Sequence, residues 1–182
     1  MIDYSKFLNN SIQEIKPSGI RKFFDIASEM DDVISLSIGE PDFQTPWHIR
    51  EEGINSLKNG KTWYSPNRGF AQLREEIANY YARRFNISYE GKTQVLVTVG
   101  GSEAIDLAFR CLVSEGDEVI IPEPSFVCYE PLTHMAGGKA VIINTKAEDQ
   151  FRLKADDLEK AITDKTKLVV LPFPNNPTGA IM

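Results

Sequence analysis

The feature that most constrains the fold is an alternation of apolar strands and helices over the second half of the chain. Short runs rich in Val, Ile and Leu predict strands at residues 94–99, 118–121, 140–143 and 167–171. Between them, segments 103–113, 126–135 and 158–162 have the spacing of helices. Strands that are apolar throughout indicate a parallel sheet covered on both faces. The pattern therefore predicts an α/β fold, a three-layer sandwich around a mostly parallel (mixed) sheet.

The first ninety residues are mainly helix and loop. A helical stretch at 20–30 precedes a short β-like run at 33–38. Thr45 and Pro46 are typical of an N-cap and a first helical position, and this helix is expected to end at Asn59-Gly60. Residues 61–68 read as a loop, and a long amphipathic helix follows from Phe70. We expect a boundary of packing near residue 90.

Composition and charge exclude several classes of function. Hydrophobic residues make up 42% of the 182 residues and charged residues 25%, which is typical of a globular domain. The net charge of -6 argues against a nucleic-acid partner. No apolar stretch is long enough to cross a membrane, and the N-terminus lacks an apolar signal core. These observations predict a soluble, cytoplasmic protein.

The cysteines and histidines offer little chemistry of their own. Cys111 and Cys128 lie in apolar surroundings without a CxxC partner, so we expect buried free thiols in a reducing compartment. His48 and His134 lack metal-ligand spacing with any cysteine or acidic residue. The sequence therefore predicts no metal site.

The junction Gly100-Gly101-Ser102 joins a predicted strand to a predicted helix. Glycines let the backbone approach a ligand closely, and the free N–H groups and the dipole of a helix amino end favour an anion. This spacing is neither a Walker motif nor GxGxxG. A tight turn followed by a helix cap explains the same three residues, so both readings stay open.

Two proline-rich loops follow predicted strands. Residues 173–179 hold two asparagines among prolines, and their X-Pro bonds are candidates for the cis isomer. Residues 122–126 end on Phe126, whose ring offers a flat stacking surface. Ligands of open α/β sheets bind at the carboxyl edge, where both loops are expected. A plain surface turn and a core phenylalanine are the alternatives.

Two residues in the first half are weaker candidates. Gly39 follows a short apolar run and could present its N–H to a carboxylate, although a plain turn explains it equally well. Tyr64, in a polar loop, has a phenol able to reach beyond its own subunit, although exposed loop tyrosines often have no role.

Taken in order, these segments resemble one family. SIGEPDF, TWYSPNRG, VTVGGSEAI, GDEVIIPEPSF and NNPTG are similar to the class I/II aminotransferases of the aspartate aminotransferase superfamily, fold type I. The likeness runs from about Lys16 to the last residue. It implies pyridoxal 5'-phosphate as the cofactor. It also implies that residues 1–45 are an N-terminal arm and the start of a small domain, and that 46–182 begin the large cofactor-binding domain, incomplete at its C-terminus.

The resemblance implies a role for each candidate residue. Gly100, Gly101 and Ser102 match the segment that holds the cofactor phosphate. Phe126 matches the aromatic residue that stacks on the pyridine ring, where many relatives carry Trp or Tyr. Asn176 matches the asparagine that bonds the ring's phenolic oxygen and also touches the substrate carboxylate.

The two residues of the first half also have counterparts. Gly39 matches a glycine whose backbone meets the substrate carboxylate. Tyr64 matches a tyrosine that reaches the neighbour's phosphate, which implies a homodimer with shared active sites. Residues 16–20 resemble an N-terminal segment that closes over the substrate.

The implied reaction moves an amino group between an amino acid and a 2-oxo acid, in the aspartate, aromatic or acyl-diaminopimelate branch. Three family parts have no match among the 182 residues: the aspartate at the pyridine nitrogen, the Schiff-base lysine and the arginine for the substrate carboxylate. We therefore assign no catalytic residue and expect an enzyme only as the full-length protein. A C–S β-lyase of the same fold and a non-catalytic effector-binding module are the alternatives.

Overall fold

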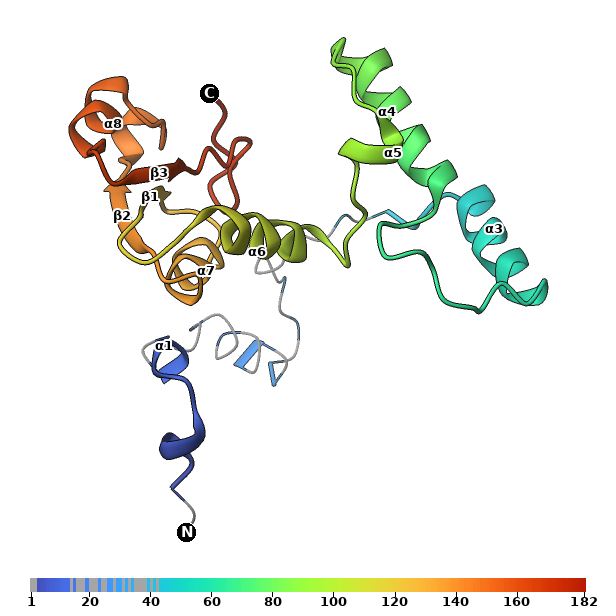
Figure 1. Cartoon of the computed structure of the whole chain (residues 1–182), viewed down its shortest axis with the longest axis horizontal. Helices are drawn as coiled ribbons and strands as arrows, with labels where there is room; N and C mark the ends of the chain where they lie inside the picture. Colours follow the sequence, from blue (N-terminus) through green and yellow to red (C-terminus); the bar gives the residue numbers. More distant parts are fainter. Residues whose placement is uncertain are drawn as a thin grey trace. The chain divides into compact units, whose positions relative to one another are not determined.

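A computed structural model describes residues 3–13, 15, 19, 23, 26–27, 29–30, 32, 34, 39, 41 and 43–182. The chain forms two compact units (Figure 1). We call Met1–Ser18 with Val99–Met182 the sheet unit, and Gly19–Thr98 the helical unit. Each is described by itself. Most of the predicted helix at 20–30 and of the predicted strand at 33–38 lies outside the described residues.

The sheet unit is built on three parallel strands. They are β1 (Glu118–Glu123), β2 (Lys139–Asn144) and β3 (Thr166–Val169), in the order β2-β1-β3. The central strand is the most buried: Val119, Ile120 and Ile121 are at most 1% exposed. The strands expected at 118–121, 140–143 and 167–171 are therefore confirmed, with ends that differ by one or two residues.

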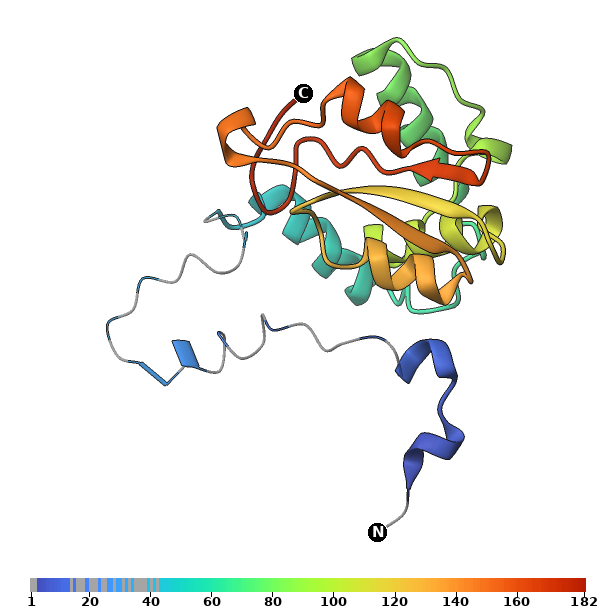
Figure 2. The ribbon, with the colours of Figure 1, turned by 90° about the vertical axis from the view of Figure 1, so that its left-hand side faces the viewer.

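Helices cover both faces of this sheet. On one face, α6 (Gly101–Leu112) and α7 (Tyr129–Met135) pack against Val119 and Ile121 through a cluster that includes Phe109. On the other face, α8 (Ala155–Ala161) packs against the cluster of Ile120, Ile143 and Leu153. Figure 2 shows the strands between α7 and α8. The three-layer α/β sandwich is confirmed, because neighbouring residues of β1 point to opposite layers.

Three short helical turns complete the sheet unit. They are η1 (Tyr4–Phe7), α1 (Asn10–Gln13) and η2 (Ala147–Asp149). The helix expected at 126–135 begins later, at Tyr129, because Phe126 and its neighbours form a turn after β1.

The helical unit contains α3 (Trp47–Lys58), α4 (Ala71–Phe85) and α5 (Gly91–Gln94). The predicted helix end at Asn59-Gly60 is confirmed, since Gly60 takes a positive φ of 68°. The predicted N-cap Thr45 is wrong. Pro46 has extended dihedrals and its carbonyl accepts the first helical hydrogen bonds, which makes Pro46 the cap.

The strand predicted at residues 94–99 is also wrong. Gln94 ends α5, and the backbone after it is extended at Val95 without joining a sheet. The alternating sequence is typical of a strand, but a strand exists only when it pairs with a neighbour. Among the described residues this segment pairs with no strand. A backbone hydrogen bond from Val97 N–H to the Arg68 carbonyl, at 3.1 Å, links it to the loop before α4.

The thiols differ from expectation in one case. Cys111 and Cys128 are both free, but Cys111 is exposed. It lies on the side of α6 turned away from the buried Phe109 and Val113.

No helix in the described part of the chain is long and apolar enough to cross a bilayer.

Candidate functional site

The carboxyl edge of the sheet carries both proline loops. Pro122 and Glu123 end β1, and the Glu123 carbonyl accepts hydrogen bonds from the backbone N–H and the hydroxyl of Thr145, each at 2.7 Å. Thr145 directly follows β2, so this bond ties the ends of two neighbouring strands together. Because the strands are parallel, the loop after β3 emerges at the same edge.

Asn175 joins the loop after β3 to the loop after β1. Its side chain is 7% exposed, and its Nδ2 donates to the Pro124 carbonyl at 2.8 Å. Its backbone N–H donates to the Ala180 carbonyl at 2.9 Å, and its carbonyl accepts from Gly179 N–H at 2.8 Å. The loop is therefore closed on itself and fastened to its neighbour. Sequence reasoning missed this residue.

The predicted site residues of these loops lie beside that fastening. Asn176 is exposed and follows Asn175 directly, and the peptide bonds before Pro174 and Pro177 are cis, as the sequence suggested they could be. Phe126 is half-buried, two residues beyond Pro124, with its ring 6.0 Å from that of Tyr129 in an edge-to-face arrangement. The backbones that carry Asn176 and Phe126 are thus both held at this edge.

The amino end of α6 has the form of an anion site. Gly100 caps the helix with φ 85° and ψ 165°, a backbone conformation open essentially to glycine alone. A Cβ atom placed on Gly100 or Gly101 would have nothing within 4 Å, so the backbone is approachable. Ser102 is exposed in the first turn, whose N–H groups have no acceptors within the helix. The Glu103 carboxylate accepts a hydrogen bond from Val99 N–H.

The packing of α6 places this helix end at the same edge of the sheet. Five residues connect α6 to β1, and Phe109 and Val113 pack on Val119 and Ile121. The helix therefore runs antiparallel to β1. Its twelve residues span about 18 Å, close to the length of the strand, so its amino end lies toward the end of β1.

Two ionisable side chains, those of Cys128 and Tyr129, follow Phe126 in the chain. Burial raises the pKa of the Cys128 thiol. Burial also raises the pKa of the Tyr129 phenol, with a smaller contribution from Cys128. Both groups therefore stay protonated at neutral pH, which suits a structural role better than a nucleophilic one.

Gly39 and Tyr64 belong to the helical unit. Both are exposed, and the Tyr64 side chain is 99% exposed. A Cβ on Gly39 would meet nothing within 4 Å. Their predicted roles stay predictions.

Among the described residues, no group of three or more histidines, cysteines and acids is arranged to hold a metal ion.

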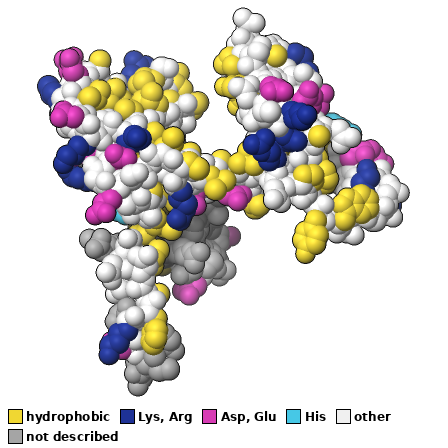
Figure 3. Space-filling model, in the orientation of Figure 1, with side chains coloured by type: hydrophobic (Ala, Val, Ile, Leu, Met, Phe, Trp, Pro, Cys, Tyr) yellow, Lys and Arg dark blue, Asp and Glu magenta, His cyan; other side chains and the backbone are white. Residues whose placement is uncertain are grey.

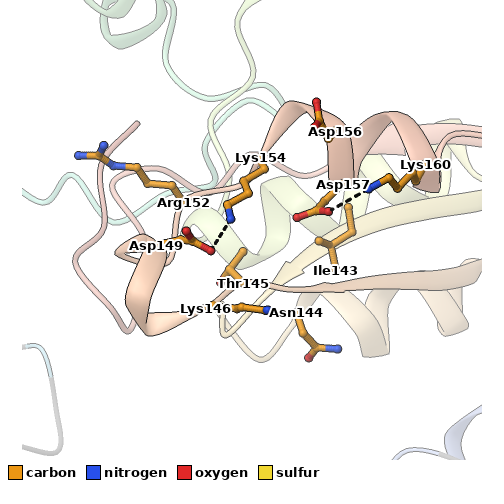
Figure 4. Close-up of a pocket in the computed structure, with 10 residues that line it drawn as sticks. All are labelled: Ile143, Asn144, Thr145, Lys146, Asp149, Arg152, Lys154, Asp156, Asp157 and Lys160. Atoms are coloured by element: carbon orange, nitrogen blue, oxygen red, sulfur yellow. Dashed lines mark ion pairs between the residues drawn. The ribbon is translucent and has the colours of Figure 1, made fainter.

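A separate charged groove lies beyond the end of β2 (Figure 4). It has a volume of about 320 Å³ and is lined by residues from β2, η2 and α8. Lys154 Nζ lies 2.7 Å from a carboxylate oxygen of Asp149, and Lys160 lies 3.9 Å from Asp157. The hydrogen bond that Lys154 donates to the Asp149 carboxylate raises the pKa of Lys154. These two ion pairs neutralise part of the charge that lines the groove.

Comparison with known proteins agrees with this geometry. The family model described as aminotransferase class I and II matches residues 31–182. A putative aminotransferase of Bacillus subtilis, YugH, is 50% identical over 97% of this chain and 46% of its own length. An aromatic-amino-acid aminotransferase of Thermococcus litoralis is 43% identical over 96% of this chain and 45% of its own.

Solved structures give the same result. The aspartate aminotransferase of Thermus thermophilus, as a single mutant, superposes with a TM-score of 0.88 at 38% identity, over 96% of this chain and 46% of the other. An α/β sheet with a helix amino end at its carboxyl edge is typical of a class of proteins that bind phosphate-bearing ligands. Within that class, the chain belongs to the class I and II aminotransferase family. It spans just under half the length of the relatives it matches.

The family's cofactor is pyridoxal 5'-phosphate, and the residues at the sheet edge suit its parts. The phosphate dianion matches the dipole and the backbone N–H groups at the amino end of α6. The open space around Gly100 and Gly101 leaves room for it. The aromatic ring of Phe126 and the amide of Asn176 suit a flat ring that carries a phenolic oxygen.

Proposed function

We propose that the full-length protein is a pyridoxal-phosphate-dependent transaminase that moves an amino group between an amino acid and a 2-oxo acid. The observation that carries the proposal is the hydrogen bond that joins two of three candidate features at the sheet edge toward which the third points. These are the α6 amino end, the loop bearing Phe126 and the loop bearing Asn176. Family membership supplies the reaction class.

The phosphate is held by the backbone of Gly100 and Gly101 and by the Ser102 hydroxyl. The first-turn N–H groups of α6 donate to its oxygens, and the helix dipole offsets its charge. Because Gly100 already adopts its unusual conformation, little reorganisation accompanies binding.

The ring is held by Phe126 and Asn176. Phe126 stacks on one face, and its edge-to-face contact with Tyr129 limits rotation of the phenyl ring. Asn176 donates its amide to the phenolic oxygen, which lowers that oxygen's proton affinity. Pyridoxal phosphate supplies the electron sink for amino transfer, and the protein orients it.

The substrate is bound by Gly39 and Asn176, each meeting the α-carboxylate. The relatives named above include a putative aminotransferase and aromatic-amino-acid and aspartate aminotransferases, and another is a probable N-acetyl-LL-diaminopimelate aminotransferase. We therefore propose an aspartate, aromatic or acyl-diaminopimelate amino donor, in a cytoplasmic homodimer whose Tyr64 reaches the neighbour's phosphate.

The test is amino-group transfer by the full-length protein loaded with pyridoxal phosphate. Aspartate, the aromatic amino acids and an acyl-diaminopimelate are each incubated with 2-oxoglutarate, and glutamate formation is followed. Faster glutamate formation from one class of amino acid than from the others supports the proposal and identifies the amino donor. Absence of transfer across a broad amino-acid panel contradicts it.

The same preparation separates the alternatives. Release of pyruvate and ammonia from cysteine or cystathionine, without transfer, would favour a β-lyase. A protein that binds the cofactor and releases nothing from any substrate would favour a non-catalytic module.

A further inference from the structure

We infer that Asn175 is a positioning residue, which fixes the loop bearing Asn176 against the loop bearing Phe126. The inference rests on the proposed function, because it concerns how the two cofactor-contacting residues keep their relative positions. It assigns a role to a residue that does not itself need to touch the cofactor.

The geometry begins with the bond between Asn175 and Pro124. Nδ2 donates to the Pro124 carbonyl at 2.8 Å, across 51 residues of sequence. Asn176 is the next residue after the donor, and Phe126 lies two residues after the acceptor. A change in this one bond is therefore transmitted to both loops over a very short length of backbone.

Both ends of the bond are anchored. Pro124 follows Glu123, whose carbonyl accepts two hydrogen bonds from Thr145 at 2.7 Å. Asn175 is held by backbone bonds to Gly179 and Ala180 that close its own loop. The side-chain bond thus joins two locally rigid segments, which is the arrangement that fixes the distance between them.

A second observation separates positioning from simple stabilisation. The Oδ1 atom of Asn175 is buried and accepts no hydrogen bond from the residues that the structure describes. A buried acceptor without a donor lowers stability, so a side chain chosen for stability alone would be expected to lack it. The amide supplies the Nδ2 donor to Pro124, and a tolerated cost of this kind is typical of functional sites.

The bond made by Asn175 also bears on the orientation of Asn176, the next residue in the chain. Asn176 is exposed and has no buried contacts of its own to fix its direction. Its orientation toward the cofactor's phenolic oxygen therefore depends on the backbone that Asn175 holds. Removing the bond should weaken cofactor binding and change the proton affinity that Asn176 sets.

The experiment uses the full-length apoprotein with Asn175→Leu, which keeps the branching of the side chain at Cγ and removes the donor. Asn175→Asp is a second variant that keeps the shape and turns the donor into an acceptor. The control is Asn144→Ala, an exposed asparagine at the end of β2. Pyridoxal phosphate affinity and the pH titration of the bound cofactor's absorbance are measured for each variant, together with thermal unfolding of the apoprotein.

We expect affinity to fall about tenfold in both Asn175 variants and to be unchanged in Asn144→Ala. The absorbance titration should shift in the same direction as in Asn176→Ala. In the double variant Asn175→Leu/Asn176→Ala it should shift no further than in Asn176→Ala alone, because a positioning residue acts through its neighbour.

Unchanged affinity and titration in a folded Asn175 variant would overturn the inference, as would additive shifts in the double variant. If the leucine variant does not fold, Asn175→Asp, alone and combined with Asn176→Ala, decides the question in the same way. If the wild-type protein gives no cofactor band at all, the proposed function fails instead, so the two failures are distinguishable.

Discussion

At the scale of single residues, the two glycines that begin α6 differ in what they require. Neither has a neighbour within 4 Å of the place where a Cβ would stand. Only Gly100 has a positive φ, and with ψ at 165° it occupies a region that side chains other than hydrogen rarely enter. Conformation, and not space, therefore explains the glycine at position 100.

This difference predicts opposite effects of two matched substitutions in the full-length protein. Gly100→Ala should lower the free energy of unfolding by about 1–3 kcal/mol, because alanine is strained at that backbone conformation. Gly101→Ala should be neutral or raise it by up to about 1 kcal/mol, because Gly101 is helical and unobstructed. Urea unfolding of the apoproteins measures both. Equal effects at the two positions would show that the positive φ has no energetic weight.

The adjacent asparagines show how far sequence reasoning reaches. Asn176 was predicted as a site residue, and it lies exposed at the sheet edge. Asn175, beside it, had no predicted role. Its partner is the Pro124 carbonyl, 51 residues away, and no local pattern encodes such a bond. Chemistry tied to a motif could be predicted, whereas a contact made by the fold could not.

At the scale of elements, the amino ends of the strands are tied together by Glu118. Its side chain is 10% exposed and accepts hydrogen bonds from Lys139 Nζ at 3.1 Å and from the Thr163 hydroxyl at 2.7 Å. Its backbone N–H donates to the Lys165 carbonyl at 2.8 Å. One residue at the start of β1 thus contacts the start of β2 and the turn before β3.

These contacts predict a loss of stability in acid. The Thr163 bond, and then that from Lys139, hold the pKa of Glu118 below its usual 4.5. A carboxylate whose pKa is lower in the folded state stabilises the fold at pH values above its unfolded-state pKa. This contribution is lost as the pH falls through the folded-state pKa. Glu118→Gln should therefore lower unfolding free energy at neutral pH and flatten its acid dependence. Urea unfolding across the acid range checks this, and parallel pH profiles for both proteins would contradict it.

The strands themselves show why some elements are readable from sequence. The runs at 119–121 and 140–143 are apolar throughout, and the structure pairs them side by side in the sheet. The run at 94–99 has a similar composition but forms no strand. Apolar patterning reveals the tendency to pair, whereas pairing itself depends on a neighbour that a single segment does not specify.

At the scale of the whole molecule, much apolar surface is exposed. Hydrophobic side chains gather over β3 and the C-terminal segment on the face shown in Figure 3. Val169, Leu171 and Ile181 are 37%, 55% and 63% exposed. Exposed apolar area of this kind marks surfaces that other chain segments cover. This agrees with a chain that spans just under half of each relative.

The proposed sharing of active sites predicts complementation between two damaged proteins. Full-length Asn176→Ala and Tyr64→Phe homodimers should each bind cofactor weakly, because every site contains a lesion. In a mixed dimer with Tyr64 acting across the interface, one site carries both lesions and the other carries neither. Remixing equal amounts should therefore restore about a quarter of the wild-type sites. Absence of any restored sites after exchange would show that Tyr64 does not act across an interface.

The most direct test of the central claim is a titration of the full-length apoprotein with pyridoxal phosphate, followed by absorbance. Wild type is compared with Ser102→Ala, which removes a phosphate hydrogen bond, and with the control Asn144→Ala, an exposed asparagine at the end of β2. Wild type and the control should bind alike, and Ser102→Ala should bind about tenfold or more weakly. Equal affinity for all three proteins, or no binding by wild type, would contradict a cofactor site at the amino end of α6.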